Sequence, residues 1–416
     1  MKTILSLLQK TRVASSQMAQ LSDKKRSELI HAIAEALEEN SSTILAANKK
    51  DYDAMADTDP KKDRLLLTSE RIRGIVSDVH TVADLPDPTG NILLERTLEN
   101  GIQLQKISVP LGVVGVIYES RPNVTVDVSA LALRSGNAAV LRGGSDAVHS
   151  NEAIVSIIHR VLERYGLPVD IVQLLPTDRK FVKELLQAEK YVDIIIPRGS
   201  QKLIQFVREN SVIPTIETGA GVCHTFVEKS ADLQKATNIV VNAKTQRPSV
   251  CNALDTVLVS TEIAKKFLPL ILPDFEKFEV EIFADKRSHE ILKTTGYPHL
   301  QQAKEEDFGR EFLSQKCSVK IVDSFEEALQ HIEKYSSRHS EAIVSEDKEL
   351  CEQFLTRVDA ASVFANASTR FSDGGVYGLG AEIGISTQKL HARGPFALEK
   401  LTTEKWILRG DGQVRE

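Results

Sequence analysis

The sequence is poor in cysteine, with four among 416 residues, at positions 223, 251, 317 and 351. No two of them form a CxxC pair, and no histidines gather beside them at the spacing of metal ligands. A disulfide framework and a zinc site of the usual kinds are therefore not expected. We expect reduced thiols, no bound metal and a cytoplasmic location.

A basic excess and long apolar runs are missing as well. The formal net charge is −6 and the pI is near 6.0, whereas nucleic-acid-binding domains usually carry a basic patch or stripe. No stretch approaches the roughly 18 consecutive apolar residues of a membrane span, and the N-terminus is too polar for a signal peptide. We expect neither nucleic acid nor a membrane among the partners.

The length exceeds that of a single hydrophobic core, so we expect two or more domains. Residues 1–80 predict amphipathic helices, with Leu29, Ile30, Ile33, Ala34 and Leu37 on one stripe. Two alternating runs then flank Asn100-Gly101, which predicts a hairpin over 92–109, and the tail at 401–410 alternates like a further strand. Such a hairpin commonly mediates assembly, although a plain surface hairpin fits the pattern equally well.

From residue 112 apolar strand candidates alternate with helical segments, which predicts parallel sheets in an α/β protein. The first group of candidates comprises 113–118, 138–142, 171–175, 192–196 and 212–217. A second group follows with VCHTFV, TVLVS, VEIFA, VKIVD, AIV and SVFAN. We predict a domain over 1–220 that includes the hairpin, a domain over 221–395, and a strand in 396–416 that joins the hairpin.

Several of these strands end in short glycine-containing or polar turns. Three turns stand out: Arg121-Pro122-Asn123, Arg142-Gly143-Gly144-Ser145 and Arg198-Gly199-Ser200. Glycine and serine at a helix N-terminus suit a phosphate group, although the GxGxxG dinucleotide motif is absent. Each turn taken alone also fits an ordinary tight connection from a strand to a helix.

Cys251 lies in QRPSVCNALDTVLV, and a lone cysteine is most often a buried core residue. However, the order SVPLGVVGVIYESRPN, SGNAAVLRGGS, PRGS, IETGAG and then a cysteine resembles the aldehyde dehydrogenase superfamily. QRPSVCNALDTVLV, ALQHIEKYSSRHSEAIV and FSDGGVYGLGAEIGISTQKLHARGPFALEKLTT are similar to the γ-glutamyl phosphate reductase family, and the resemblance runs from about residue 20 to 410. It implies an aldehyde-dehydrogenase-like fold with a Rossmann-type cofactor domain and an α/β catalytic domain.

The resemblance implies reduction of L-glutamyl 5-phosphate to glutamate 5-semialdehyde and phosphate, the second step from glutamate to proline. Cys251 would form the thioester, and thiolate chemistry suits both attack and release. Pro248 predicts a helix N-terminus at Cys251, which would lower the pKa of the thiol. Asn123 would hold the oxyanion. Glu217, which precedes Cys251 by 34 residues, has the position of the superfamily glutamate, but its role stays open between catalytic and structural.

The resemblance also implies a nicotinamide cofactor. Arg142 with Ser145, where NAD-preferring relatives often carry glutamate, favours the 2′-phosphate of NADP. Gly199 and Ser200 would face the pyrophosphate. Glu311 resembles the glutamate that binds the nicotinamide ribose, although the glycine-proline that follows it in the family is absent.

The substrate carries negative charge at both ends, so we expect Arg121, Arg247 and Arg393 to bind it, because guanidinium suits carboxylate and phosphate. Other possibilities remain: a non-phosphorylating NAD-dependent aldehyde dehydrogenase, a catalytically inert scaffold, or Cys223 as the nucleophile. We also expect a homo-oligomer, and coupling to glutamate 5-kinase is plausible for an unstable acyl phosphate.

Overall fold

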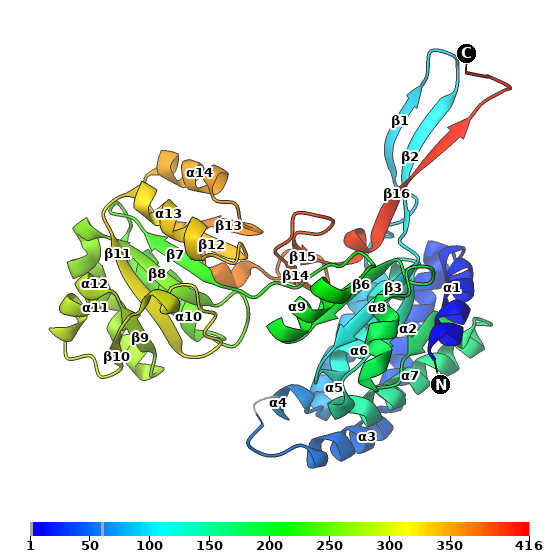
Figure 1. Cartoon of the computed structure of the whole chain (residues 1–416), viewed down its shortest axis with the longest axis horizontal. Helices are drawn as coiled ribbons and strands as arrows, with labels where there is room; N and C mark the ends of the chain where they lie inside the picture. Colours follow the sequence, from blue (N-terminus) through cyan, green and yellow to red (C-terminus); the bar gives the residue numbers. More distant parts are fainter. Residues whose placement is uncertain (1–2, 60–61, 416) are drawn as a thin grey trace. The chain divides into compact units, whose positions relative to one another are not determined.

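The computed structural model describes residues 3–59 and 62–415, which divide into two compact units. Unit 1 runs to Thr218 and also contains Gly378–Gly384 and the chain from Phe396, while unit 2 contains Gly219–Tyr377 and Ile385–Pro395. Figure 1 follows the chain by colour. The first boundary lies two residues before the predicted one. Gly378–Gly384, which we predicted in the second domain, belongs to unit 1 because Gly380 packs closely against Leu85.

Unit 1 opens with helices, as the amphipathic pattern predicts. They are α1 (Leu5–Ala19), α2 (Asp23–Glu39), α3 (Ser41–Ala54), α4 (Lys62–Leu65) and α5 (Ser69–Asp84). The Ser22 side chain accepts the Lys25 backbone N–H at the start of α2, which satisfies one free donor of the first turn. The predicted apolar stripe of α2 is buried. None of the helices in the described parts of the chain is long and apolar enough to cross a membrane.

The sheet of unit 1 is parallel, with the strand order β5-β4-β3-β6. Its strands are β3 (Val113–Tyr118), β4 (Ala138–Arg142), β5 (Val172–Leu174) and β6 (Ile194–Arg198), and they alternate with α6 (Pro122–Arg134), α7 (Val148–Arg164), α8 (Arg179–Leu186) and α9 (Gln201–Asn210). The strand predicted at 212–217 is wrong, since only Thr215 forms an isolated bridge, to Ile195. Pro214 has no N–H to continue a ladder there.

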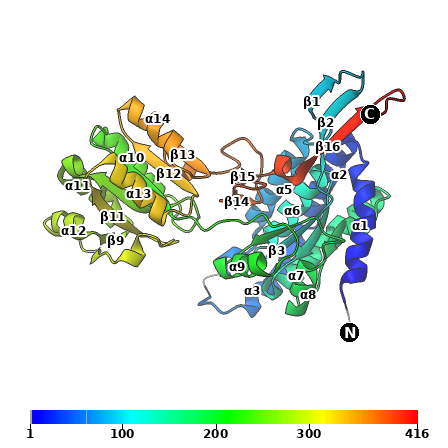
Figure 2. The ribbon, with the colours of Figure 1, turned by 45° about the horizontal axis from the view of Figure 1, so that its top comes forward.

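Three antiparallel strands form a second sheet of unit 1, in the order β1-β2-β16, which we call the arm. They are β1 (Ile92–Thr97), β2 (Gln103–Pro110) and β16 (Thr402–Arg409). Gly101 takes the positive φ of 86° that the turn requires, and the tail pairs with the hairpin along β2, as predicted. Figures 1 and 2 show the arm extending away from the helices of its unit.

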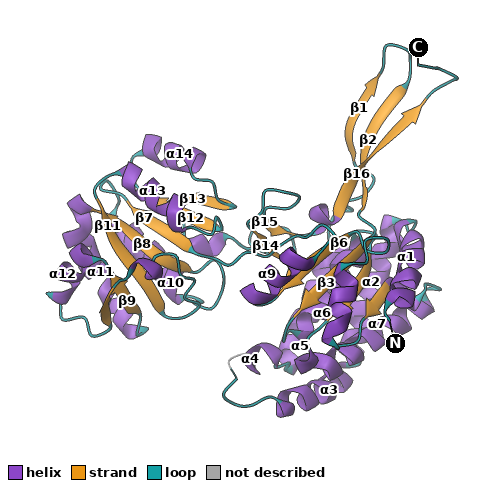
Figure 3. Cartoon of the chain, in the orientation of Figure 1, coloured by secondary structure: helices purple, strands orange, loops and turns teal. Residues whose placement is uncertain are grey.

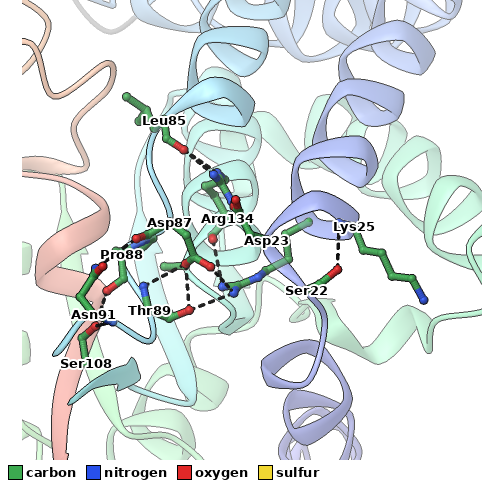
Figure 4. Close-up of polar contacts among 12 residues, drawn as sticks. Ser22, Asp23, Lys25, Leu85, Asp87, Pro88, Thr89, Asn91, Ser108 and Arg134 are labelled. Carbon is green, nitrogen blue, oxygen red and sulfur yellow. Dashed lines mark hydrogen bonds and ion pairs between the residues drawn. The ribbon is translucent and has the colours of Figure 1, made fainter. Parts of the chain in front are cut away.

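Two buried arginines fix the base of the arm, and Figure 4 labels one of them, Arg134, with its partner Leu85. Arg26 donates to the Asp87 carboxylate at 2.7 Å and to the Thr89 hydroxyl at 2.9 Å, and Arg134 donates to the Leu85 carbonyl. Both side chains are almost fully buried. The segment that leads from α5 into β1 is therefore tied to α2 and α6 by charged hydrogen bonds.

Unit 2 is built on one parallel sheet of seven strands, in the order β10-β9-β11-β8-β7-β12-β13 (Figure 3). They are β7 (Cys223–Val227), β8 (Leu254–Ser260), β9 (Glu281–Ala284), β10 (Leu300–Gln302), β11 (Lys316–Val322), β12 (Ser340–Val344) and β13 (Ser362–Ala365). Helices α10 (Leu233–Thr245), α11 (Thr261–Lys277) and α12 (Lys286–Lys293) share one apolar core with the sheet, and α13 (Phe325–Tyr335) and α14 (Lys348–Arg357) share another. The six predicted strands of this unit are confirmed, and β10 is additional.

Short elements occur in the last fifty residues. They are the 3-10 helices Thr369–Phe371 and Leu398–Leu401 and the strands β14 (Gly384–Ser386) and β15 (Gly394–Phe396). The α/β class with parallel sheets, predicted from the alternation of strands and helices, is confirmed.

Candidate active site

Cys251 lies in a turn of unit 2 that connects α10 to β8. The helix N-terminus predicted at this cysteine is wrong: the Ala253 N–H closes a turn onto the Val250 carbonyl at 3.1 Å, and β8 begins at Leu254. Pro248 therefore starts a turn rather than a helix. Without a helix after it, Cys251 has no helix dipole of its own to stabilise a thiolate.

The backbone of Cys251 is held from two sides. The thiol of Cys223 donates to the Cys251 carbonyl at 3.2 Å. Gly221 packs so closely on the same carbonyl that a Cβ atom on Gly221 would overlap it. The N–H of Gly221 in turn donates to the Glu311 carboxylate at 2.8 Å. Glu311, predicted to bind the nicotinamide ribose, thus positions the glycine that supports Cys251.

The four cysteines, all within the described residues, differ in accessibility. Cys223, Cys317 and Cys351 are buried, and Cys251 alone is half-buried. Burial raises the pKa of the Cys223 thiol well above its usual value, and the carboxylates of Glu341 and Asp255 raise it further. A thiol with a raised pKa is a poor nucleophile. The structure therefore disfavours Cys223 as the reactive cysteine.

The predicted arginines of unit 2 lie in different settings. Arg247 is exposed in the same turn as Cys251. Arg393 donates to the Asp359 carboxylate at 2.8 Å, and Lys389 contacts the same carboxylate at 2.8 Å. These two cations hold the pKa of Asp359 down to about 2. Arg393 is thus already paired with a carboxylate of its own unit.

Asn123 stands in the first turn of α6 in unit 1, directly after Arg121 and Pro122, as the turn pattern predicts. Its amide donates to the Asp127 carboxylate at 3.0 Å, and an amide nitrogen carries a second hydrogen that this bond does not use. Burial raises the pKa of Asp127 to about 7 despite this hydrogen bond. Asp127, which the sequence analysis did not select, orients the predicted oxyanion donor.

Glu217 lies at the end of the irregular segment that follows α9, in unit 1. It forms an ion pair with Arg208 at 3.7 Å, and burial raises the pKa of its carboxyl, which Arg208 partly opposes. The structure therefore gives Glu217 a local ionic partner. Its catalytic role stays a prediction.

A cavity of about 170 Å³ opens at the carboxyl ends of β4 and β5. Its lining residues are Gly143, Val148, Asn151, Glu152, Leu174, Leu175, Pro176 and Thr177. Ligands of parallel α/β sheets bind at this edge. Pro176 and Thr177 were not predicted as site residues, although their position directly after an apolar strand could have indicated them.

Arg142 and Ser145 lie on either side of Gly143-Gly144, and Gly143 lines the cavity. Arg142 donates to the Thr177 carbonyl at 2.7 Å, and its buried Nε has no hydrogen-bond partner among the described residues. Burial lowers the pKa of Arg142, and nearby Arg179 lowers it further. Ser145 begins the 3-10 helix Ser145–Ala147 that leads into α7. The structure thus places a partly buried guanidinium and a small hydroxyl in one strand-to-helix connection.

The N-terminus of α9, predicted to face a pyrophosphate, holds a carboxylate of the chain itself. The Ser200 N–H donates to Glu119 at 3.0 Å, and the Ser200 hydroxyl lies 3.4 Å from the same carboxylate. A Cβ atom on Gly199 would lie 2.8 Å from Glu119. Glu119, which follows β3, thus occupies the anion-binding end of this helix.

The candidate residues therefore form two groups. Residues of unit 1 follow the ends of β3, β4 and β6 or the segment after α9: Arg121, Asn123, Arg142, Ser145, Gly199, Ser200 and Glu217. Residues of unit 2 are Arg247, Cys251, Glu311 and Arg393. In the described residues, no group of three or more His, Cys, Asp or Glu side chains could hold a metal ion.

Comparisons with known proteins identify the family of the chain. Residues 2–289 match the model of the aldehyde dehydrogenase family. The acetylating aldehyde dehydrogenase of Geobacillus thermoglucosidasius, 18% identical, has a similar fold, with a TM-score of 0.71 over 99% of this chain and 97% of that one. The chain belongs to the aldehyde dehydrogenase family, whose members use a nicotinamide cofactor.

Full-length relatives define the branch. The γ-glutamyl phosphate reductase of Chlorobium phaeobacteroides is 55% identical over 100% of this chain and 99% of its own length. That of Bacteroides fragilis is 53% identical over 97% of each chain. The crystal structure of the Thermotoga maritima γ-glutamyl phosphate reductase, 42% identical, matches with a TM-score of 0.95 over 100% of both chains. Within its superfamily the chain belongs to the γ-glutamyl phosphate reductases, oxidoreductases of proline biosynthesis that act on a small molecule.

Proposed function

We propose that this chain reduces L-glutamyl 5-phosphate to L-glutamate 5-semialdehyde and phosphate with NADPH, through a thioester at Cys251. The observation that supports this chemistry is the difference in burial among the four cysteine thiols. Three are buried, while Cys251 is half-buried in a turn whose backbone is fixed by Cys223 and Gly221. The substrate class comes from the full-length similarity to γ-glutamyl phosphate reductases.

In the proposed reaction the Cys251 thiolate attacks the acyl carbon, and phosphate leaves with the electrons of the broken bond. A nicotinamide cofactor, when bound, supplies the hydride that reduces the thioester. The resulting thiohemiacetal at Cys251 then releases the aldehyde and regenerates the thiolate. We assign the oxyanion to the free N–H of the Asn123 amide and the backbone N–H of Cys251, because such donors stabilise the developing charge.

We propose that the substrate's carboxylate and phosphate are bound by Arg121, Arg247 and Arg393. Arg247 is the best supported, because it is exposed in the turn that carries Cys251. Arg393 is bound to Asp359, so its role in binding requires that the substrate replaces or shares that partner.

The residues of unit 1 fit a dinucleotide. The cavity at the ends of β4 and β5 is lined by both apolar and polar residues, and the unpartnered Nε of Arg142 offers a buried donor. We propose that Arg142 and Ser145 hold the 2′-phosphate of NADP and that Gly199 and Ser200 hold the pyrophosphate in place of Glu119. Glu152 also lines the cavity and is the residue that would explain a preference for NAD.

The reverse reaction tests this proposal. Purified protein is mixed with glutamate 5-semialdehyde, and reduced nicotinamide is followed with and without phosphate, with NADP or NAD. We expect phosphate-dependent formation of NADPH that is lost in Cys251→Ala and kept in Cys317→Ala. Activity without phosphate would support the non-phosphorylating alternative, with Glu217 activating water. No turnover by the folded protein would support an inert scaffold.

We further propose that the arm mediates a homo-oligomer, as is typical of the family. Its exposed apolar side chains include Ile92, Leu93, Trp406 and Leu408. Four exposed apolar residues on a three-stranded sheet favour pairing with a second copy. Light scattering on the protein and on Trp406→Glu tests this, with a smaller particle expected for the variant. A cytoplasmic location remains a proposal, as does coupling to glutamate 5-kinase. Co-purification with the kinase would test the coupling.

A further inference from the structure

Arg370 lies 119 residues after Cys251 in the chain, in the short 3-10 helix Thr369–Phe371. Its Nε donates to the Gln246 side-chain carbonyl at 2.8 Å, and its Nη1 donates to the Asn252 side-chain carbonyl. Gln246 precedes Cys251 by five residues, and Asn252 follows it directly. One guanidinium therefore bridges the two ends of the turn that carries the cysteine.

The same segment returns hydrogen bonds to Asn252. The Thr369 hydroxyl donates to the Asn252 backbone carbonyl at 2.8 Å, and the Asn252 amide donates to the Ser372 carbonyl at 2.9 Å. Asn252 is only 3% exposed, so these bonds do not compete with solvent. Both carbonyls and the side-chain amide of the residue beside Cys251 are thus engaged by one short segment.

The charge of Arg370 also acts on this turn. Burial lowers the pKa of Arg370, and nearby Arg247 lowers it further, while Cys251 and Asp373 oppose that change. Two guanidinium groups are therefore placed together beside Cys251. On the other side, Cys223 of β7 contacts the Cys251 carbonyl.

The acidic groups of this region interact with residues other than Cys251. Asp255 and Glu341 act on Cys223, and Glu311 is bound to the Gly221 amide. Asp373 is the acidic group on the Arg370 side. Because Cys251 has no following helix, the positive charge that stabilises a thiolate must come from side chains.

We propose that Arg370 is a positioning residue, which fixes the turn that presents Cys251 and, together with Arg247, stabilises the cysteine as thiolate. The proposal rests on the proposed function, in which Cys251 is the nucleophile. Lysine at this position keeps the charge but lacks the planar fork that spans Gln246 and Asn252. The two contributions of Arg370 can therefore be separated by substitution.

The test compares Arg370→Met, Arg370→Lys, Gln246→Met and Cys251→Ser in the full chain. Arg357→Met, which removes an exposed ion pair with Glu326, is the matched control. Iodoacetamide labelling of Cys251 is measured against pH by peptide mass spectrometry, without substrate or cofactor. Turnover with glutamate 5-semialdehyde, phosphate and NADP gives kcat and KM, and thermal unfolding gives Tm.

For Arg370→Met we expect the labelling midpoint to rise by about one pH unit and kcat to fall at least roughly tenfold, with the KM for NADP within about twofold. Arg370→Lys should keep the midpoint and lose kcat several-fold. Gln246→Met should keep the midpoint with a smaller loss of kcat. Arg357→Met should match the unsubstituted protein in all readouts.

The outcomes distinguish the proposed role of Cys251 as nucleophile from the proposed role of Arg370 as a positioning residue. If Cys251→Ser stays active, the proposed nucleophile is wrong. If Cys251→Ser is inactive and Arg370→Met keeps both its labelling midpoint and its kcat, the role of Arg370 is wrong. A loss of Tm with an unchanged midpoint and kcat would also overturn it, because Arg370 would then be structural only. Should Arg370→Met not fold, full kcat in Arg370→Lys overturns the positioning role.

Discussion

Gly221 lies so close to the backbone carbonyl of Cys251 that a side chain at position 221 would overlap that carbonyl. The contact fixes the position of the Cys251 backbone and so the position from which its side chain extends. A methyl group at Gly221 must push the carbonyl of Cys251 away. Because nucleophilic attack depends on placement within an ångström, we expect this glycine to control the reactivity of Cys251, the proposed nucleophile.

Gly221→Ala should therefore lower kcat by roughly a hundredfold or more, because the nucleophile is displaced. Steady-state turnover with glutamate 5-semialdehyde, phosphate and NADP measures this. The matched control is Gly74→Ala within α5, where a Cβ atom meets nothing within 4 Å. That change should leave kcat unaltered and raise stability by about 0.5–1 kcal/mol. Equal kcat in both variants would contradict the displacement.

Glu119→Gln should tighten NADPH binding by roughly threefold to tenfold. A carboxylate at the N-terminus of α9 competes with the cofactor phosphates proposed for Ser200, and the neutral amide is held less strongly there. Fluorescence titration of NADPH gives the dissociation constant without turnover. Glu163→Gln, on the exposed face of α7, is the control and should bind like the parent protein. Weaker binding in Glu119→Gln would show that Glu119 helps to hold the cofactor.

Apolar runs in the sequence made the parallel sheets predictable. β3 and β4 occupy the predicted residues, because an apolar run between polar turns has few alternatives to a buried strand. The failures have local causes. Pro214 interrupts the ladder at 212–217, and β10 is a short edge strand with two exposed glutamines that gives no apolar signal.

The sequence indicates candidate site residues where a short motif carries them, as for Asn123 and Cys251, whose roles stay predictions. The site was not predictable where function depends on contacts between distant segments. Arg370 reaches Asn252 across 118 residues of sequence, and Glu119 reaches Ser200 across 81. Nothing in the spacing of these residues indicates the contact, because only the fold brings their segments together.

Asp127→Asn should stabilise the protein at neutral and higher pH but not at acid pH. The folded-state pKa of Asp127 is raised by burial to about 7, from an ordinary value of 3.8. Folding thus takes up a proton between these values, so the destabilisation from Asp127 grows from about pH 4 to pH 7 and is constant above. We expect a gain on the order of 2–4 kcal/mol at pH 8 and none at pH 4.

Urea unfolding of Asp127→Asn at pH 4, 6 and 8 measures this gain. Asp53→Asn, at an exposed ion pair with Lys49, is the control and should show no such trend. A gain of equal size at all three pH values would mean that packing, and not ionisation of Asp127, is responsible. Turnover should fall modestly, because asparagine still accepts the Asn123 hydrogen bond but without charge.

Arg26→Met should destabilise unit 1 by about 2–4 kcal/mol, because it leaves the Asp87 carboxylate in a mostly buried position without its charged partner. Lys49→Met, which breaks an exposed pair, should cost less than about 1 kcal/mol. Urea unfolding compares the two free energies. Hydrogen exchange locates the effect: amides at residues 85–91 should exchange faster in Arg26→Met, since this segment depends on Arg26 for its anchoring. Unchanged exchange there, with a loss of stability elsewhere, would mean that Arg26 supports the packing of α2 and not the base of the arm.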